Sequence, residues 1–243
     1  MKALSMFLPV ALASILAGAA VAQTPTGSAG LDPVLKKMDE MSAKFTSAQA
    51  DFEWDRYEKV INEIDTVQTG TISYRRSGKD VEMMAEVKKE GPTLDQLKAD
   101  PKYVLFKGGK VQVFQPKPNQ VTEWDLGKNA SDFESYLVLG FGGSGEDLVK
   151  QFDVTYLGPE TIDGKATAKL QLIPKSDRVR NNFKQILLWI DLDRGISIQQ
   201  QFTEPQGDYR LSKYHSVQLN QKINNDVFRL KTNGKTETVS PRG

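Results

Sequence analysis

The chain has 243 residues, which is enough for one large domain or two small ones. Its 32 Lys and Arg residues almost balance its 31 Asp and Glu residues, so the formal net charge is +1. A near-neutral chain without a long basic run has little electrostatic reason to bind nucleic acid or an anionic membrane surface. The sequence has no Cys and a single His, which excludes disulfides, thiol chemistry and iron–sulfur clusters, and almost any zinc site.

The first 22 residues have the pattern of an export signal. Lys2 precedes an apolar run from Phe7 to Val21, and the run ends in Ala20-Val21-Ala22, an A-x-A cleavage pattern. An uncleaved anchor is the alternative, although the run is short for a membrane span. We therefore expect residues 1–22 to be a cleaved signal peptide, the mature protein to reside in the periplasm, and residues 23–30 to be a flexible lead-in.

An amphipathic helix is predicted directly after the lead-in. Asp32 has the position of an N-cap, and Pro33 that of the first helical residue. Apolar residues then recur every three or four positions as far as Phe45, which predicts one helix over roughly residues 32–47.

From residue 48 the apolar period changes to two. Residues 48–55, 71–76 and 80–88 alternate between apolar and polar side chains, which is typical of half-buried antiparallel strands. Turn signals such as Gly108-Gly109 and Asp163-Gly164 join further hairpins. The whole pattern gives about eleven strands, six before a helical insert and five after it.

The insert contains two short predicted helices. A capping-box pattern at Ser131–Glu134 opens the first, which carries Phe133 and Leu137 and stops at Gly140. The second covers residues 144–152. No change of composition divides the chain, so we predict a single domain over residues 31–231 and a loose tail over residues 232–243.

These elements predict a mainly β fold with helices (α+β). A strongly twisted antiparallel sheet of this size curls toward a barrel. The apolar faces of the helices must also be buried, and the open side of the curled sheet is the available surface. We therefore expect an incomplete, strongly curved antiparallel β-barrel of about eleven strands, with a lid of about three helices over an apolar cavity.

Motifs for catalysis or cofactor binding are weak. Residues 140–145 match G-x-G-x-x-G, but they follow a helix and open no βαβ unit, so a hinge is the better interpretation. Asp191 and Asp193 lack the spacing of a calcium loop. His215 is expected to be a packed or partly exposed strand residue; a Ser–His–Asp arrangement stays open, although no G-x-S-x-G motif is present. We expect no enzyme, no cofactor and no metal site.

Arg76 is the most informative charged residue. Strand alternation places it on the same face as Ile72 and Tyr74, where a guanidinium without partners costs several kcal/mol. Either the strand ends there and Arg76 reaches water, or its side chain points into the concavity. In the second case its acceptors would be carbonyls of a covering helix or the polar group of a ligand.

Large apolar side chains supply the candidate cavity lining. Each is a core residue by default, but unbranched Met and large aromatic side chains together suit a cavity that adapts to flexible cargo. The candidate cargo-binding residues are Phe52, Trp54, Ile72, Tyr74, Met83, Phe133, Leu137 and Phe141.

Several stretches resemble the LolA/LolB lipoprotein-carrier family, over roughly residues 31–230. The stretches are Gly70–Arg76, which ends in the arginine, Gly108–Phe114, Leu170–Pro174 and Ile186–Asp191, and they occur in the family's order. The sequence departs from the family at Ser77, where the family has Pro, and in an insert near residues 90–100.

The resemblance implies an incomplete β-barrel closed by a helical lid, and Arg76 as the latch that bonds the lid until cargo enters. It also implies a periplasmic carrier of acylated lipoproteins, with an inner-membrane exporter and an outer-membrane acceptor as partners. A relative that carries another lipid fits equally well. We expect a monomer, and the alternative function is an envelope binding or sensor module of the same fold that regulates a protein partner.

Overall fold

The computed structural model describes residues 28–77, 80–127, 139 and 141–241. The helices are α1 (Ser28–Ser42), α3 (Gly145–Gln151), α4 (Asp177–Arg180) and the 3₁₀ turns η1 (Leu94–Gln96) and η3 (Asn225–Phe228). The first strands are β1 (Ser47–Glu58), β2 (Glu63–Ser77), β3 (Asp80–Gly91), β4 (Lys98–Lys107), β5 (Lys110–Gln115) and β6 (Gln120–Asp125). The others are β7 (Phe152–Ile162), β8 (Lys165–Pro174), β9 (Gln185–Asp191), β10 (Ile196–Thr203), β11 (Tyr209–Leu219) and β12 (Glu237–Val239).

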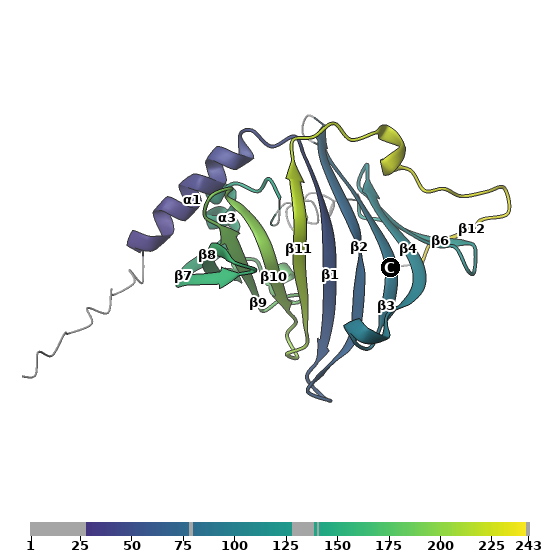
Figure 1. Ribbon diagram of the computed structural model, residues 1–243, viewed down its shortest axis with the longest axis horizontal. Helices are drawn as coiled ribbons and strands as arrows, with labels where there is room; N and C mark the ends of the chain where they lie inside the picture. Colours follow the sequence, from purple (N-terminus) through teal and green to yellow (C-terminus); the bar gives the residue numbers. More distant parts are fainter. Residues whose placement is uncertain (1–27, 78–79, 128–138, 140, 242–243) are drawn as a thin grey trace, which may run out of the picture.

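The described strands form one sheet, in the order β12-β6-β5-β4-β3-β2-β1-β11-β10-β9-β8-β7 (Figure 1). Within β1–β6 and within β7–β11, neighbours in sequence pair as antiparallel hairpins, and β1 pairs with β11, which joins the two halves of the chain. The edge strands β7 and β12 do not pair with each other, so the curved sheet is not closed. The predicted incomplete antiparallel barrel is confirmed, with one strand more than expected.

The residues at two of the turns explain why hairpins form there. Gly108 and Gly109 have φ angles of 58° and 72°, and Asp163 and Gly164 have φ angles of 48° and 74°. Two consecutive residues with positive φ are what a two-residue turn needs to match the twist of its strands.

Helix α1 differs from its prediction at both ends. It begins at Ser28, so residues 28–30 belong to the helix rather than to a flexible lead-in, and Pro33 lies inside it. The capping signal at Asp32 is local and does not prevent one further turn before it. The helix ends at Ser42 rather than near residue 47, and the free Ser42 carbonyl and hydroxyl make tertiary hydrogen bonds with Arg76 and Gly142.

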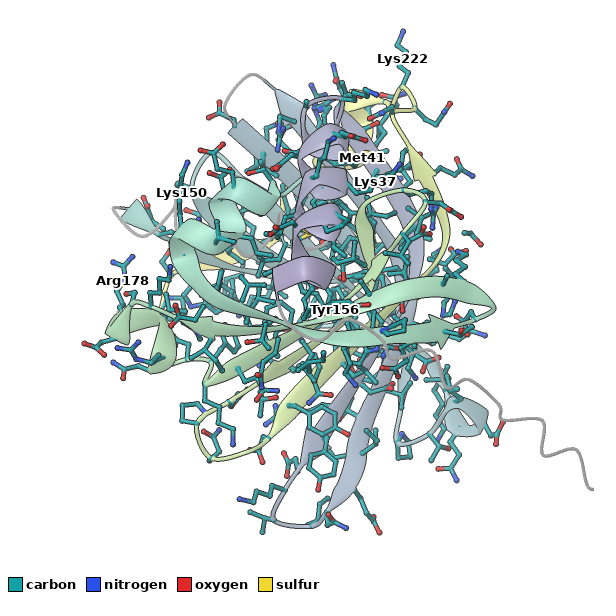
Figure 2. All side chains as sticks on the ribbon, turned by 90° about the vertical axis from the view of Figure 1, so that its left-hand side faces the viewer. Lys37, Met41, Lys150, Tyr156, Arg178 and Lys222 are labelled. Atoms are coloured by element: carbon teal, nitrogen blue, oxygen red, sulfur yellow. The ribbon has the colours of Figure 1, made fainter. Side chains whose placement is uncertain are left out.

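Helices α1 and α3 lie together over the strands at one end of the sheet (Figure 2). Val34 and Met38 of α1 and Leu148 of α3 are buried against an apolar cluster from β8 and β9. The Ser144 hydroxyl caps α3 by accepting a hydrogen bond from the Asp147 amide at 3.0 Å. The predicted helix that opens at Ser131 lies outside the described residues. In the described part of the chain, no helix is long and apolar enough to cross a membrane.

The prediction of a loose C-terminal tail is wrong for residues 237–239. They form β12, which pairs in parallel with β6. The Glu237 amide donates to the Asn119 carbonyl oxygen at 3.1 Å, and the Thr236 hydroxyl donates to the Asn119 side-chain oxygen at 2.9 Å. An edge strand such as β6 exposes unpaired backbone groups, and the returning tail satisfies them.

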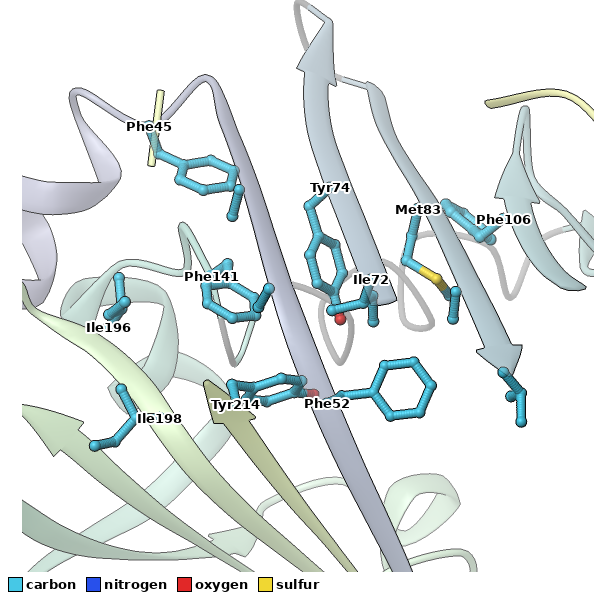
Figure 3. Close-up of a cluster of buried hydrophobic side chains, with 14 residues drawn as sticks. Phe45, Phe52, Ile72, Tyr74, Met83, Phe106, Phe141, Ile196, Ile198 and Tyr214 are labelled. Atoms are coloured by element: carbon cyan, nitrogen blue, oxygen red, sulfur yellow. The ribbon is translucent and has the colours of Figure 1, made fainter. Parts of the chain in front are cut away.

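Both faces of β3 and β4 are buried. Met83 and Phe106 belong to a cluster on the face that we call the inner face, which Phe45 and Phe141 cover at the helical end (Figure 3). Met84 and Leu105 point to the opposite, outer face, where Phe228 of η3 covers them. The helices and the C-terminal segment therefore occupy opposite faces, which leaves the remaining part of the inner face to form the candidate site.

Candidate functional site

A cavity of about 640 Å³ lies on the inner face of the sheet. This volume falls within the range of ~300–1,000 Å³ that is typical of small-molecule sites. Its lining comes from β1–β4, β10 and β11 and the loop before β9: Trp54, Asp55, Arg56, Thr66, Gln68, Ile72, Tyr74, Met83, Glu90, Lys102, Val104, Phe183, Gln200, Phe202, Arg210, Ser212 and Tyr214.

The end of the cavity nearest the helices is apolar. Tyr74 of β2 lies opposite Met83 of β3 in the strand register, and both are buried. The Phe141 ring packs between the rings of Tyr74 and Tyr214, with centroid distances of 5.2 Å and 5.0 Å (Figure 3). Phe141 therefore separates the cavity from the helical end of the core.

Two buried tyrosines place neutral hydroxyl groups in this apolar wall. The hydroxyl groups of Tyr74 and Tyr214 are close enough to influence each other's ionisation. Burial raises the pKa of Tyr74 well above its usual value and also raises the pKa of Tyr214. Both groups stay protonated at neutral pH, so they add hydrogen-bonding capacity to the wall without adding charge.

The opposite end of the cavity is polar, because the residues farther from the helices along β1, β2 and β11 carry charges or amides. Lys102 contacts Glu90 at 2.6 Å. Partial burial works against ionisation of Glu90, but hydrogen bonds from Lys102 and Gln68 lower its pKa overall. The side-chain nitrogen of Gln200 is buried and has no hydrogen-bond partner among the described residues.

Four of the predicted cargo-binding residues line the cavity: Trp54, Ile72, Tyr74 and Met83. Phe52 and Phe141 are packed in the adjacent core, 2% and 1% exposed. The Phe52 ring stacks on Trp54 at 4.0 Å and occupies the space above Gly70, where a Cβ atom would lie 2.9 Å from the ring. The predicted residues Phe133 and Leu137 lie outside the described residues.

Arg76 points toward the helical end. Its guanidinium donates to the carbonyl oxygens of Ser42 at 3.1 Å and Gly142 at 2.8 Å, and it lies 5.5 Å from the centre of the Phe45 ring. The sequence left two orientations open for Arg76, toward water or toward acceptors in the concavity. The structure has the second, and the acceptors are backbone carbonyls, one of them at the end of the covering helix α1.

The glycine-rich segment makes close contacts with α1 and the residues that follow it. Gly142 has a φ of +84°, and a Cβ atom there would lie 2.4 Å from the Phe45 ring. A Cβ atom on Gly145 would lie 2.6 Å from the Leu35 carbonyl oxygen. The sequence predicts a hinge here, but it gives no sign of these contacts because both neighbours are distant in the chain. Tyr214 and Gln200 are site residues that the sequence analysis missed for the same reason.

His215 is partly exposed, as expected, and its Nδ1 atom lies 3.3 Å from a carboxylate oxygen of Asp163. This pair is formed between β11 and the β7–β8 turn and does not include a cavity-lining residue. Among the described residues, no group of three or more acidic or His side chains could hold a metal ion.

Solved structures share this fold at low sequence identity. The structure of MucB is 15% identical, with a TM-score of 0.50, over 84% of this chain and 64% of that one, so this chain spans less than two thirds of MucB. An uncharacterised conserved protein from Thermus thermophilus is 12% identical, with a TM-score of 0.51, over 87% of this chain and 96% of that one. No family model and no curated protein sequence matches the chain.

The unclosed, strongly curved sheet with helices over one end is the architecture that the sequence resemblance predicts. The chain shares this fold with MucB and with the Thermus thermophilus protein. A LolA superfamily protein from Nitrosomonas europaea also matches, at 15% identity over 81% of this chain and 96% of that one, with a TM-score of 0.38. Identities this low show a shared fold alone and leave cargo and partners to be inferred from the site.

Proposed function

We propose that this protein is a periplasmic carrier that shelters the acyl chains of lipoproteins, or of a related lipid, and shuttles them toward the outer membrane. The observation that supports this proposal most directly is the cavity of about 640 Å³, whose inner end is lined by Ile72, Tyr74 and Met83. An inner-membrane exporter and an outer-membrane acceptor are the partners that such a role requires.

The energetics of lipid transport explain the need for a cavity. Exposing an acyl chain of about 16 carbons to water costs roughly 12 kcal/mol, at about 0.8 kcal/mol per methylene group. A carrier without an apolar site could not hold such a chain in solution. The unbranched Met83 side chain and the aromatic rings around it can adjust to a flexible chain.

Arg76 is the proposed latch of this carrier. Its two hydrogen bonds connect β2 to the end of α1 and to the Gly142 segment, so their loss would free the helical end of the sheet. Such a latch would let the carrier alternate between holding and releasing its cargo.

Lipid extraction tests the proposal. The full chain is expressed with its N-terminal segment, purified from the periplasm without detergent, and extracted with organic solvent for mass spectrometry. We expect acyl lipid or lipidated peptide to accompany the protein. Val104→Trp should reduce this amount, because Val104 lines the cavity and the larger ring would fill it. The matched control is Leu157→Trp, since Leu157 is 44% exposed on β7.

A wild-type protein that carries no lipid would contradict the carrier role. The second candidate, a binding module that regulates a protein partner, would then be favoured. It draws support from MucB, which has the same fold and for which a structure in complex with MucA has been solved. A pull-down of envelope proteins with the purified chain would test it.

A further inference from the structure

Two arginines face each other at the polar end of the cavity. Arg56 of β1 and Arg210 of β11 are register partners in the antiparallel pair, and both line the cavity. Their side chains are 49% and 66% exposed, so they lie at the cavity mouth. In the next register position, Tyr57 and Tyr209 stack with ring centroids 4.5 Å apart, which fixes the two arginines opposite each other.

This arrangement opposes stability, because like charges directly across an antiparallel pair repel. The nearby carboxylates compensate only weakly. Arg56 Nη2 lies 3.2 Å from a Glu58 oxygen, and Arg210 Nε lies 3.9 Å from a Glu204 oxygen, which is beyond hydrogen-bond length. Most of the five N–H donors of each guanidinium therefore have no acceptor in the described part of the chain.

A third donor lies deeper in the cavity. Gln200 of β10 is the register partner of Ser212, two residues from Arg210 on β11. It is 4% exposed, and its side-chain nitrogen is the unpartnered donor described above. A buried donor without an acceptor costs free energy that a bound acceptor would recover.

Other charges in the lining do not compete with this group. Lys102 contacts Glu90 at 2.6 Å and Asp100 at 3.3 Å, so it is already paired with carboxylates. The Asp55 carboxylate contacts Lys213 at 3.0 Å, a lysine that it shares with Glu53. The two arginines are thus the cationic groups of the lining that are least satisfied by neighbouring carboxylates.

We propose that Arg56 and Arg210 form a headgroup site, and that the cavity binds an amphiphile whose headgroup is a phosphate or a carboxylate. The proposal rests on the carrier function above and specifies its ligand. Planar guanidinium groups bind such oxyanions with two parallel hydrogen bonds. With the headgroup at the mouth, the apolar chain extends past Trp54 toward Met83 and Ile72.

Isothermal titration calorimetry of the full mature chain tests this site with three probes: dodecyl phosphate, dodecanol and inorganic phosphate. We expect dodecyl phosphate to bind at least about tenfold more tightly than dodecanol, because charge-assisted hydrogen bonds act only on the anionic headgroup. Inorganic phosphate should bind much more weakly than dodecyl phosphate, since it buries no apolar surface. Added salt should reduce the preference for the anion.

The decisive variant is Arg56→Gln/Arg210→Gln. It should lose the preference for dodecyl phosphate and keep the wild-type affinity for dodecanol, and the unchanged dodecanol affinity also shows that the variant is folded. Its melting temperature should equal or exceed that of the wild type, because the repulsion is removed. The control Arg229→Gln, which changes an exposed arginine paired with Asp226 outside the cavity lining, should bind like the wild type.

Equal affinity of the wild type for dodecyl phosphate and dodecanol would overturn the headgroup site and leave the carrier proposal intact. Survival of the preference in the double variant would overturn it as well. Binding of inorganic phosphate as tight as that of dodecyl phosphate would show a free-anion site instead. If neither dodecyl compound binds, the carrier function itself is wrong.

Discussion

Arg76 and Gly142 are 66 residues apart in the chain, and the Arg76 guanidinium donates to the Gly142 carbonyl oxygen at 2.8 Å. The Ser42 hydroxyl donates to the same oxygen at 2.7 Å, while the Ser42 carbonyl accepts from Arg76 at 3.1 Å. Three segments therefore meet at one carbonyl group: the end of β2, the end of α1 and the glycine-rich segment before α3. If the helical end of the sheet opens, this junction must break.

Replacing Arg76 by Leu should affect both stability and cargo release. The variant leaves the carbonyl oxygens of Ser42 and Gly142 without their guanidinium donor, which should lower the free energy of unfolding by about 1–3 kcal/mol. Under the latch proposal it should also retain bound lipid, because the closed, cargo-free state that Arg76 stabilises no longer forms. Urea unfolding measures the first effect, and transfer of labelled lipid from the protein to acceptor vesicles measures the second. Transfer at the wild-type rate would contradict the latch, and Arg229→Leu serves as the control.

Gly142→Ala should destabilise the protein more than Gly164→Ala. Both glycines have positive φ, at 84° and 74°, so both substitutions carry the backbone cost of about 1–2 kcal/mol. A Cβ atom at Gly142 would in addition lie 2.4 Å from the Phe45 ring, whereas nothing lies within 4 Å of one at Gly164. The difference between the two variants in urea unfolding isolates the cost of that close contact. Equal losses would show that Phe45 moves away without cost.

Glu82→Gln should make the protein less sensitive to acid. Burial opposes the ionisation of Glu82, but hydrogen bonds from Arg75 and Lys107 lower its pKa below the usual 4.5. A carboxyl group whose pKa is lower in the folded state stabilises the protein above its unfolded pKa, and this contribution is lost as pH falls through the folded value.

At about pH 7 the Gln variant should therefore be less stable by about 1 kcal/mol, because the two cations lose their anionic partner. The difference should shrink as pH falls below 4.5, where Glu82 itself becomes protonated. Urea unfolding of both proteins across this range checks the prediction. A difference that stays constant with pH would contradict it.

Local signals account for most of the elements that the sequence predicts correctly. The turn at Gly108-Gly109 follows from two neighbouring residues that tolerate positive φ, and the apolar period of two in residues 48–55 and 71–76 marks β1 and β2. Local signals do not predict features that depend on contacts between residues distant in the chain. The Ser42 carbonyl at the end of α1 finds its donor in Arg76, 34 residues away in the chain, and β12 pairs with the edge of β6.

The candidate site also has features that follow from local sequence and features that depend on distant contacts. Strand phase places Trp54, Ile72, Tyr74 and Met83 on the inner face, and all four line the cavity. Phase alone does not show that Phe52 fills the space above Gly70 and stacks on Trp54, because Gly70 becomes its neighbour only through the register of β1 and β2.

The sequence by itself therefore determined the succession of strands and turns along the chain, the inward-facing side chains of β1 and β2, and the curled antiparallel class of the fold. These properties depend on residues that are close together in the chain. Only the tertiary structure decided that Arg56 faces Arg210, that Gln200 lies buried beside them, and that part of the inner face stays unfilled. The Arg56–Arg210 relationship arises from the pairing of β1 with β11, which brings together segments about 150 residues apart, and such pairing leaves no local trace in the sequence.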